Sequence, residues 1–97
     1  MVLSITREDN TVSFKGELNR DTLMLHSPFA MLNALSGRVT FDMGNLTSAD
    51  TAGLAWLIQQ LALSRKKSLV VELRNVPAQL LSLADVSAVT GLLPIID

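Results

Sequence analysis

The sequence of 97 residues contains no cysteine, no tyrosine and a single histidine, His26. The lack of cysteine excludes a disulfide framework and every thiolate metal site. Charge is scarce as well: 18 % of the residues are charged, against about 25 % in a typical soluble domain, and the formal net charge is −1. Neither a basic stripe for binding nucleic acid nor a polybasic membrane anchor is present.

Apolar residues, in contrast, make up 48 % of the chain. A domain of this length buries a small share of its surface, so we expect a partner to cover part of the apolar surface. The uncharged stretch at residues 51–64 is 14 residues long, short of the ~20 that span a bilayer. The N-terminus lacks the basic and apolar regions of a signal peptide. We therefore expect one soluble, cytoplasmic domain over residues 1–97.

Apolar and polar residues alternate in four short segments, which predicts four strands. The segments are residues 3–5, 12–14, 39–43 and 69–73. The polar run at residues 7–10 is expected to join the first two strands as a hairpin. Gly44 and Asn45 are expected to turn the chain after the third.

Helical signals fall between these strands. Asp21 is the expected cap of a short helical start, and the main helices are expected at residues 28–35, from residue 50 or 51 to about 67, and after Asn75 and Pro77. The order β-β-α-β-α-β-α predicts an α/β fold, with a mixed sheet of about four strands and three to four helices.

The helix expected to end near residue 67 is apolar on both sides. At about 100° per residue, one side gathers the residues expected to face the sheet: Leu54, Leu57, Ile58 and Leu61, with Ala55 and Ala62 beside them. The opposite side carries a second, largely apolar set: Ala52, Trp56, Gln59 and Leu63, with Gln60 nearby. Two interpretations stay open. Either Trp56 packs under a loop or the C-terminal tail, or this side is a docking face, because apolar helix sides with polar rims mark interaction surfaces.

The first turn of the same helix is the second informative place. Asp50 can accept hydrogen bonds from the free backbone N–H groups there, and Thr51 lies beside the positive end of the helix dipole. Gly53 lets another backbone come close. Ordinary capping explains this pattern. The functional alternative is a Thr51 hydroxyl exposed for recognition or phosphorylation, because a phosphate is stabilised at a helix N-terminus.

The chain offers little material for catalysis or metal binding. His26 permits a Ser–His–Asp arrangement only formally, since no Gly-x-Ser-x-Gly elbow is present. A glycine-rich phosphate loop is also absent, and the carboxylates are scattered. We therefore expect a protein that is not an enzyme, has no cofactor or metal, and contains His26 in a structural or surface role.

Three segments, the last of them Leu73 through Leu83, resemble STAS domains, a family that includes anti-sigma-factor antagonists and transporter-associated modules. After the strand Thr40-Phe41-Asp42-Met43, the run Asp50-Thr51-Ala52-Gly53-Leu54 resembles the family's Asp-Ser/Thr-x-Gly-Leu helix opening. Gly16-Glu17-Leu18-Asn19 is similar to its Gly-Glu-Leu-Asp segment, with Asn19 in place of the aspartate. The resemblance covers nearly the whole chain and implies the STAS fold.

Within this family the sequence is similar to the MlaB subfamily, the cytoplasmic STAS subunits of a phospholipid-transporting ABC complex that maintains outer-membrane lipid asymmetry. The similarity lies in residues 50–55, the helix end at Lys66 and Lys67, and the tail Leu92-Leu93-Pro94. It implies that the chain binds the ATPase subunit MlaF, which sits under the permease MlaE with the lipid-binding MlaD. The chain would then lie peripheral to the inner membrane, without inserting into it.

The helix face and the resemblance together give the expected partner-binding residues: Asp50, Thr51, Ala52, Trp56, Gln59, Gln60 and Leu63. The alternative function is an anti-sigma-factor antagonist controlled by phosphorylation of Thr51. Ala52 stands where that class has a second serine, which favours the transporter hypothesis. A third class, a direct phospholipid carrier, requires an apolar cavity.

Overall fold

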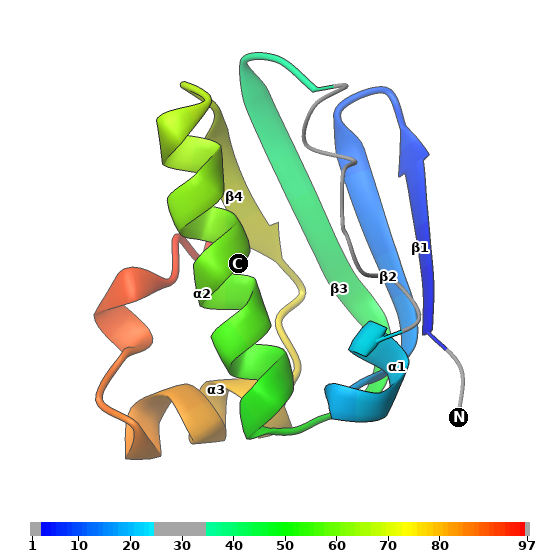
Figure 1. The fold of residues 1–97 in the computed structure, drawn as a ribbon, viewed down its shortest axis with the longest axis vertical. Coiled ribbons are helices and arrows are strands. Elements are labelled where there is room, and N and C mark those ends of the chain that lie inside the picture. Colours follow the sequence, from blue (N-terminus) through cyan, green and yellow to red (C-terminus); the bar gives the residue numbers. More distant parts are fainter. Residues whose placement is uncertain (1–2, 25–34, 97) are drawn as a thin grey trace.

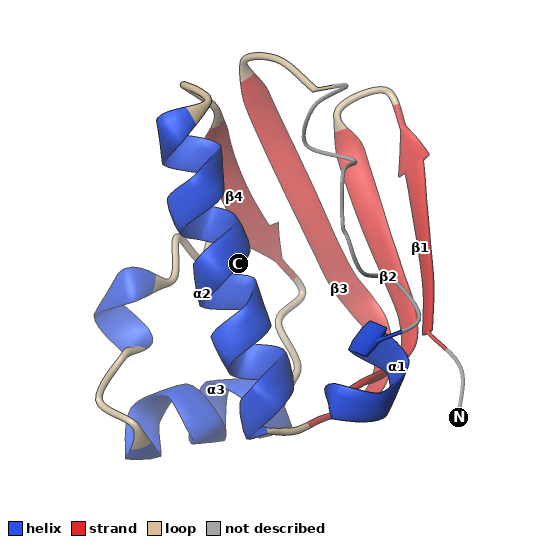
Figure 2. Cartoon of the chain, viewed as in Figure 1, coloured by secondary structure: helices blue, strands red, loops and turns tan. Residues whose placement is uncertain are grey.

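The computed structural model describes residues 3–24 and 35–96. Their elements are β1 (Leu3–Glu8), β2 (Thr11–Leu18), α1 (Arg20–Met24), β3 (Arg38–Ala49), α2 (Thr51–Lys66), β4 (Val70–Arg74), α3 (Ala78–Val86) and the 3-10 turn η2 (Thr90–Leu92). The strands form one sheet in the order β1-β2-β3-β4. Helices α1 and α2 lie over one face of this sheet, and α3 lies at the end where α2 begins (Figures 1 and 2). The predicted α/β fold with a mixed sheet is confirmed.

Strand direction follows from the connections. β1 and β2 pair antiparallel up to Glu8 and Thr11, so residues 9 and 10 form a tight hairpin turn. β2 with β3, and β3 with β4, pair parallel. Parallel neighbours require a crossover, and α2 is the crossover between β3 and β4.

Alternate residues divide the sheet into an apolar face and a polar face. The buried set faces the helices and includes Val12, Phe14, Val39, Phe41, Met43, Val71 and Leu73. The residues between them point the other way and are mostly polar, as in β3, where exposed or half-buried Arg38, Thr40 and Asp42 alternate with the core. Arg38 Nη1 and Glu72 Oε1 form an ion pair at 3.1 Å across two strands. The hydrophobic core thus lies between the sheet and α2.

Strand β3 is longer than the sequence indicated. Gly44 and Asn45 do not turn the chain, because β3 runs on to Ala49. Its pairing with β2 continues through register shifts between Ser13 and Lys15 and between Gly16 and Glu17. Such irregularities add a residue to one strand and bend it without ending the ladder. The extended strand delivers the chain directly to the first residue of α2.

The short helix α1 is capped by Asn19, so the expectation that Asp21 caps it is wrong. Asn19 Oδ1 accepts a hydrogen bond from the Thr22 backbone N–H at 3.0 Å. The Thr22 hydroxyl is buried and donates to the Glu17 carbonyl at 2.7 Å. α1 therefore begins at Arg20, one residue before Asp21. Residues 25–34, which include His26 and most of the helix expected at 28–35, lie outside the described residues.

Candidate functional site

The start of α2 is fixed by Asp50, which confirms its predicted capping role. Asp50 Oδ1 accepts a hydrogen bond from the Gly53 N–H at 2.8 Å. Oδ2 of the same carboxylate faces the Arg20 N–H, at the start of α1, at 3.5 Å. The Asp50 N–H donates to the Leu18 carbonyl at 3.2 Å. One residue thus ties the end of β2 to the first turns of two helices.

Gly53 is buried against the backbone of Leu18. A Cβ atom at this position would overlap the Leu18 carbonyl oxygen and lie 3.0 Å from Leu18 Cγ. Only glycine permits this approach. The predicted close contact of another backbone at Gly53 is confirmed, and it sets the rotation of α2 about its axis.

Thr51 is exposed as the first residue of α2, and Ala52 beside it is half-buried. Thr51 therefore presents its side chain next to the positive end of the helix dipole. The carboxylate of Asp50 is exposed next to it. The first turn accordingly offers one hydroxyl and one negative charge on a rigid backbone.

Helix α2 is rotated relative to the orientation expected from its sequence. Its buried residues are Gly53, Leu54, Leu57, Gln60, Leu61 and Ser64. The expectation that Leu54, Leu57 and Leu61 face the sheet is confirmed, and Ile58 is half-buried at the margin. Ala55 and Ala62 were expected beside the sheet, and this is wrong: both are exposed. The reason is Gly53, whose contact with Leu18 turns its own side of the helix inward.

Trp56 lies at the border between this exposed side and the core. Its ring meets Phe14 edge-on, with ring centroids 6.0 Å apart and planes at 75°. Phe14 in turn packs on Phe41 at 5.4 Å. Trp56 is therefore half-buried and has a structural role, because it packs against the core beside Phe14 of β2. Leu63 is likewise half-buried and packs against the core.

Gln60 does not belong to the outer face, contrary to expectation. It is 4 % exposed, and its Oε1 has no hydrogen-bond partner among the residues that the structure describes. One turn later, the buried Ser64 hydroxyl donates to the Gln60 backbone carbonyl at 2.8 Å. Two polar residues thus occupy positions between α2 and the core, because the rotation set by Gly53 carries them inward.

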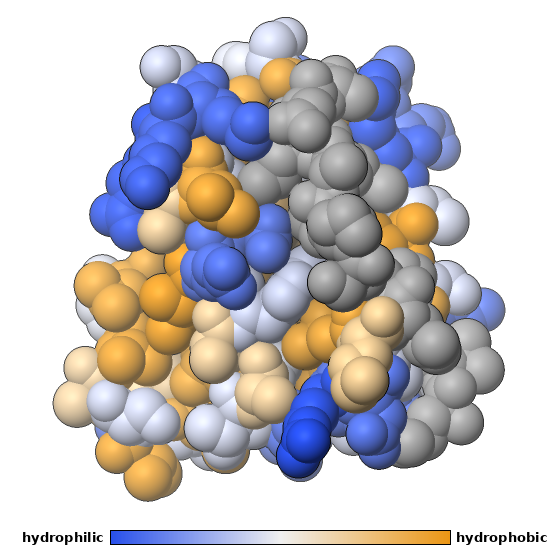
Figure 3. Space-filling model, viewed as in Figure 1, coloured by the Kyte–Doolittle hydropathy of each residue, from blue (hydrophilic) through white to orange (hydrophobic). Residues whose placement is uncertain are grey.

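The surface that remains is the outer face of α2. We define it by the exposed residues Thr51, Ala55, Gln59 and Ala62, with Ala52, Trp56 and Leu63 along one margin. No charged residue occurs between Thr51 and Ser64. Figure 3 shows this side of the molecule coloured by hydropathy. Sequence reasoning placed Gln59 here correctly and missed Ala55 and Ala62. Gly53 is the signal that could have identified them, because a glycine in the first turn marks the side of the helix that lies closest to a neighbouring backbone.

The outer face of α2 is suited to association with another protein. In the ranges 3–24 and 35–96, no three His, Asp or Glu side chains gather as metal ligands would. Within the same ranges no helix has both the length and the apolar character needed to cross a bilayer. Since this face has no charged side chain, another protein can cover it without burying a charge.

The mixed sheet with helices on one face, and the capped helix that opens directly after a central strand, match the STAS fold. The family model described as "Mlab, STAS domain" matches residues 1–94, and the chain therefore belongs to this family of STAS domains. STAS domains are protein-interaction modules and generally lack catalytic activity.

Among solved structures, the chain is similar to the anti-sigma factor antagonist SpoIIAA in its unphosphorylated form. The TM-score is 0.66 at 14 % sequence identity, covering 98 % of this chain and 87 % of that one. At this identity the likeness establishes the fold. Comparison with curated proteins gives no significant match.

Proposed function

We propose that this protein is a non-catalytic assembly subunit of an ABC transporter that moves phospholipids between the inner and outer membranes. It binds the ATPase subunit of that complex and stabilises the competent ATPase dimer. The observation that carries the proposal is the uncharged outer face of α2, which begins at a backbone locked by Asp50 and Gly53. The family match, whose description names Mlab, supports the choice of complex.

The mechanism is steric. The outer face of α2 holds its shape because its first turn is fixed to β2 and α1, so little conformational entropy is lost on docking. Small residues at Ala55 and Ala62 allow a helix or loop of the ATPase to approach closely, while Thr51 and Gln59 offer hydrogen bonds for orientation. The bound domain then favours one arrangement of its partner without any reaction of its own.

The alternative is an anti-sigma-factor antagonist switched by phosphorylation. Its supporting observation is the exposed Thr51 at the α2 N-terminus, in a fold shared with SpoIIAA. A phosphate adds about −1.5 to −2 charges at neutral pH. At Thr51 this charge would stand beside the Asp50 carboxylate, at the edge of the neutral face. Phosphorylation would therefore release a docked partner by repulsion and desolvation.

Affinity purification of the tagged protein from membranes and cytoplasm of its native cell decides between these functions. Recovery of an ABC ATPase together with its permease supports the assembly subunit. Recovery of a serine/threonine kinase and a sigma regulator, with phosphate on Thr51, contradicts it and supports the alternative. Phospholipid bound to the isolated domain would instead point to a carrier.

A further inference from the structure

A groove lies at the opposite end of α2 from the capped N-terminus. It has a volume of about 270 Å³ and is lined by the last turns of α2, the start of β4 and the C-terminal tail, including Leu61, Arg65, Leu69, Val71, Leu92 and Pro94. An apolar cavity of ~150 Å³ accepts a benzene ring, so this groove has room for one large apolar side chain. It is not part of the outer face of α2.

The floor of the groove is the free edge of the sheet. The tail pairs with this edge at a single residue: the Leu73 N–H donates to the Pro94 carbonyl at 2.9 Å, and the Ile96 N–H donates to the Leu73 carbonyl at 3.0 Å. Figure 1 shows the tail returning beside β4 behind α2. The Val70 N–H, in contrast, donates to the Gly37 carbonyl at 2.9 Å, on the side of β3. Because strand residues alternate, the backbone groups of Val71 point to the same free side as those of Leu73.

Pro94 is the reason that this edge stays open at Val71. Extending the parallel ladder by one step would require the N–H of residue 94 to donate to the Val71 carbonyl. Proline has no N–H group, and the chain before it turns away into η2. Among the described residues, no backbone hydrogen bond joins the Val71 N–H or carbonyl to the tail. The groove therefore contains one unused donor and one unused acceptor of a sheet edge.

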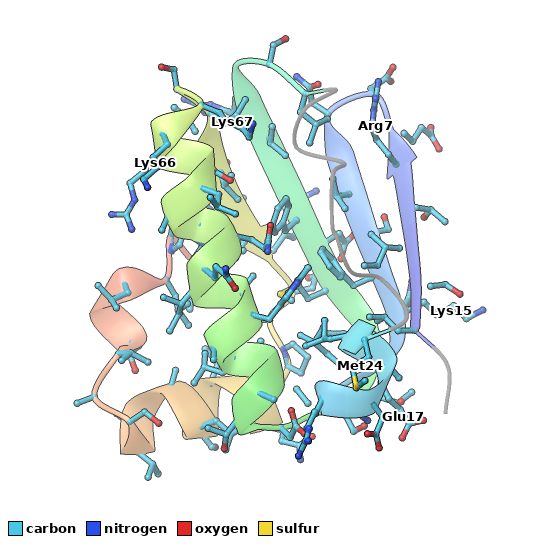
Figure 4. The ribbon with its side chains drawn as sticks, in the orientation of Figure 1. Arg7, Lys15, Glu17, Met24, Lys66 and Lys67 are labelled. Atoms are coloured by element: carbon cyan, nitrogen blue, oxygen red, sulfur yellow. The ribbon has the colours of Figure 1, made fainter. Side chains whose placement is uncertain are left out.

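The rim of the groove is basic. Arg65 lines it, Lys66 follows, and both are exposed in the last turn of α2. Figure 4 shows Lys66 and Lys67 at this end of the helix. The ion pair between Arg38 and Glu72 does not involve Arg65, and among residues 3–24 and 35–96 no carboxylate lines the groove. Leu92 adds an apolar side chain that is 51 % exposed.

We infer that this groove is a second binding site, which receives a short extended acidic segment of a partner protein. The segment adds to the sheet edge through the Val71 backbone, inserts an apolar side chain between Leu61 and Leu92, and places a carboxylate near Arg65. Backbone pairing at an exposed edge, with a pocket for an alternate side chain, is a recurring mode of peptide recognition. This site goes beyond the proposed function and does not depend on the identity of the partner at the outer face of α2.

The test uses a synthetic peptide, acetyl-Glu-Val-Leu-Val-Glu-amide, titrated into the ¹⁵N-labelled full chain. We expect NMR shifts at the amides of Arg65, Val71 and Leu92, and slower hydrogen exchange at Val71. The matched peptide with lysine in place of both glutamates should bind about fivefold more weakly, as expected for a surface ion pair. Shifts confined to other parts of the chain, or equal binding of both peptides, would overturn the proposal.

Two further comparisons distinguish a change in peptide binding from a loss of folding. Arg65→Glu should reverse the preference, so that the lysine peptide binds better, whereas Lys15→Glu, the same charge change on the polar face of β2, should leave the preference unchanged. N-methylation of the peptide at successive residues should abolish binding at one position, because the Val71 carbonyl is the single edge acceptor offered to the peptide. Loss at every position, or at none, contradicts edge pairing.

Discussion

A Cβ atom on Gly53 would overlap the carbonyl oxygen of Leu18, so a larger residue at this position must displace its surroundings. Since Gly53 stands in the first turn of α2 and Leu18 ends β2, this one contact sets how the helix meets the sheet. It buries Gln60 and Ser64 and exposes Ala55 and Ala62. The composition of the candidate binding face therefore follows from a backbone contact outside that face.

Replacing Gly53 with alanine should destabilise the fold. The new methyl group must displace Leu18 or the first turn of α2, which costs about 1–3 kcal/mol in overpacked sites, and this outweighs the ~1 kcal/mol that alanine gains in a helix. Urea denaturation measures the change. Gly91→Ala is the matched control, because a Cβ there meets nothing within 4 Å. Equal stabilities of the two variants would show that the close contact does not constrain α2.

The Asp50 side chain should contribute through its hydrogen bonds rather than its charge. Asp50→Ala removes the acceptor of the Gly53 N–H and should cost about 0.5–2 kcal/mol in the free energy of unfolding. Asp50→Asn keeps an oxygen acceptor and should cost only a few tenths of this. Thermal unfolding followed by circular dichroism compares the two. A loss in Asp50→Asn as large as in Asp50→Ala would assign the effect to charge instead.

We expect the buried polar side chain of Gln60 to lower the stability of the isolated domain. Its Oε1 is buried without a partner among the described residues, and such an atom carries a desolvation penalty of about 1–3 kcal/mol. Gln60→Leu should therefore raise the free energy of unfolding, or leave it unchanged if the new shape packs less well. Gln59→Leu, one residue away and exposed, should change it by less than about 0.5 kcal/mol. A clear loss of stability in Gln60→Leu alone would show that the amide has a partner.

The sequence was sufficient for the class of fold and for the bounds of α2. Alternation and cap signals identify the strands and the helix from Thr51 to Lys66, because each depends on neighbouring residues. The length of β3 was not predictable in this way. Gly44 and Asn45 have strong turn preferences, and only pairing with β2 through its register shifts keeps them in a strand. Tertiary pairing outweighs local preference there.

The candidate site was predictable in place but not in composition. The capped start at Asp50 and Thr51 follows from residue types that satisfy free N–H groups. The rotation of α2 about its axis does not follow from the sequence. Periodicity alone does not identify the buried side of a helix that is apolar on both sides. Gln60 was placed on the outer side and Ala62 beside the sheet because a rotation of about 100° per residue, counted from the leucine stripe, puts them there. Both placements are reversed by the Gly53 contact.

The central claim, that the outer face of α2 binds an ABC ATPase, is tested most directly at Ala55. The measurement is the dissociation constant of the full chain from the purified ATPase subunit of the proposed transporter, by isothermal titration calorimetry. Ala55→Glu places a charge in the centre of the face and should weaken binding by at least about tenfold, because the charge loses its hydration on docking. Ser82→Glu, at an exposed position of α3, should bind like the wild type. Unchanged binding of Ala55→Glu, with the variant folded, would contradict the account.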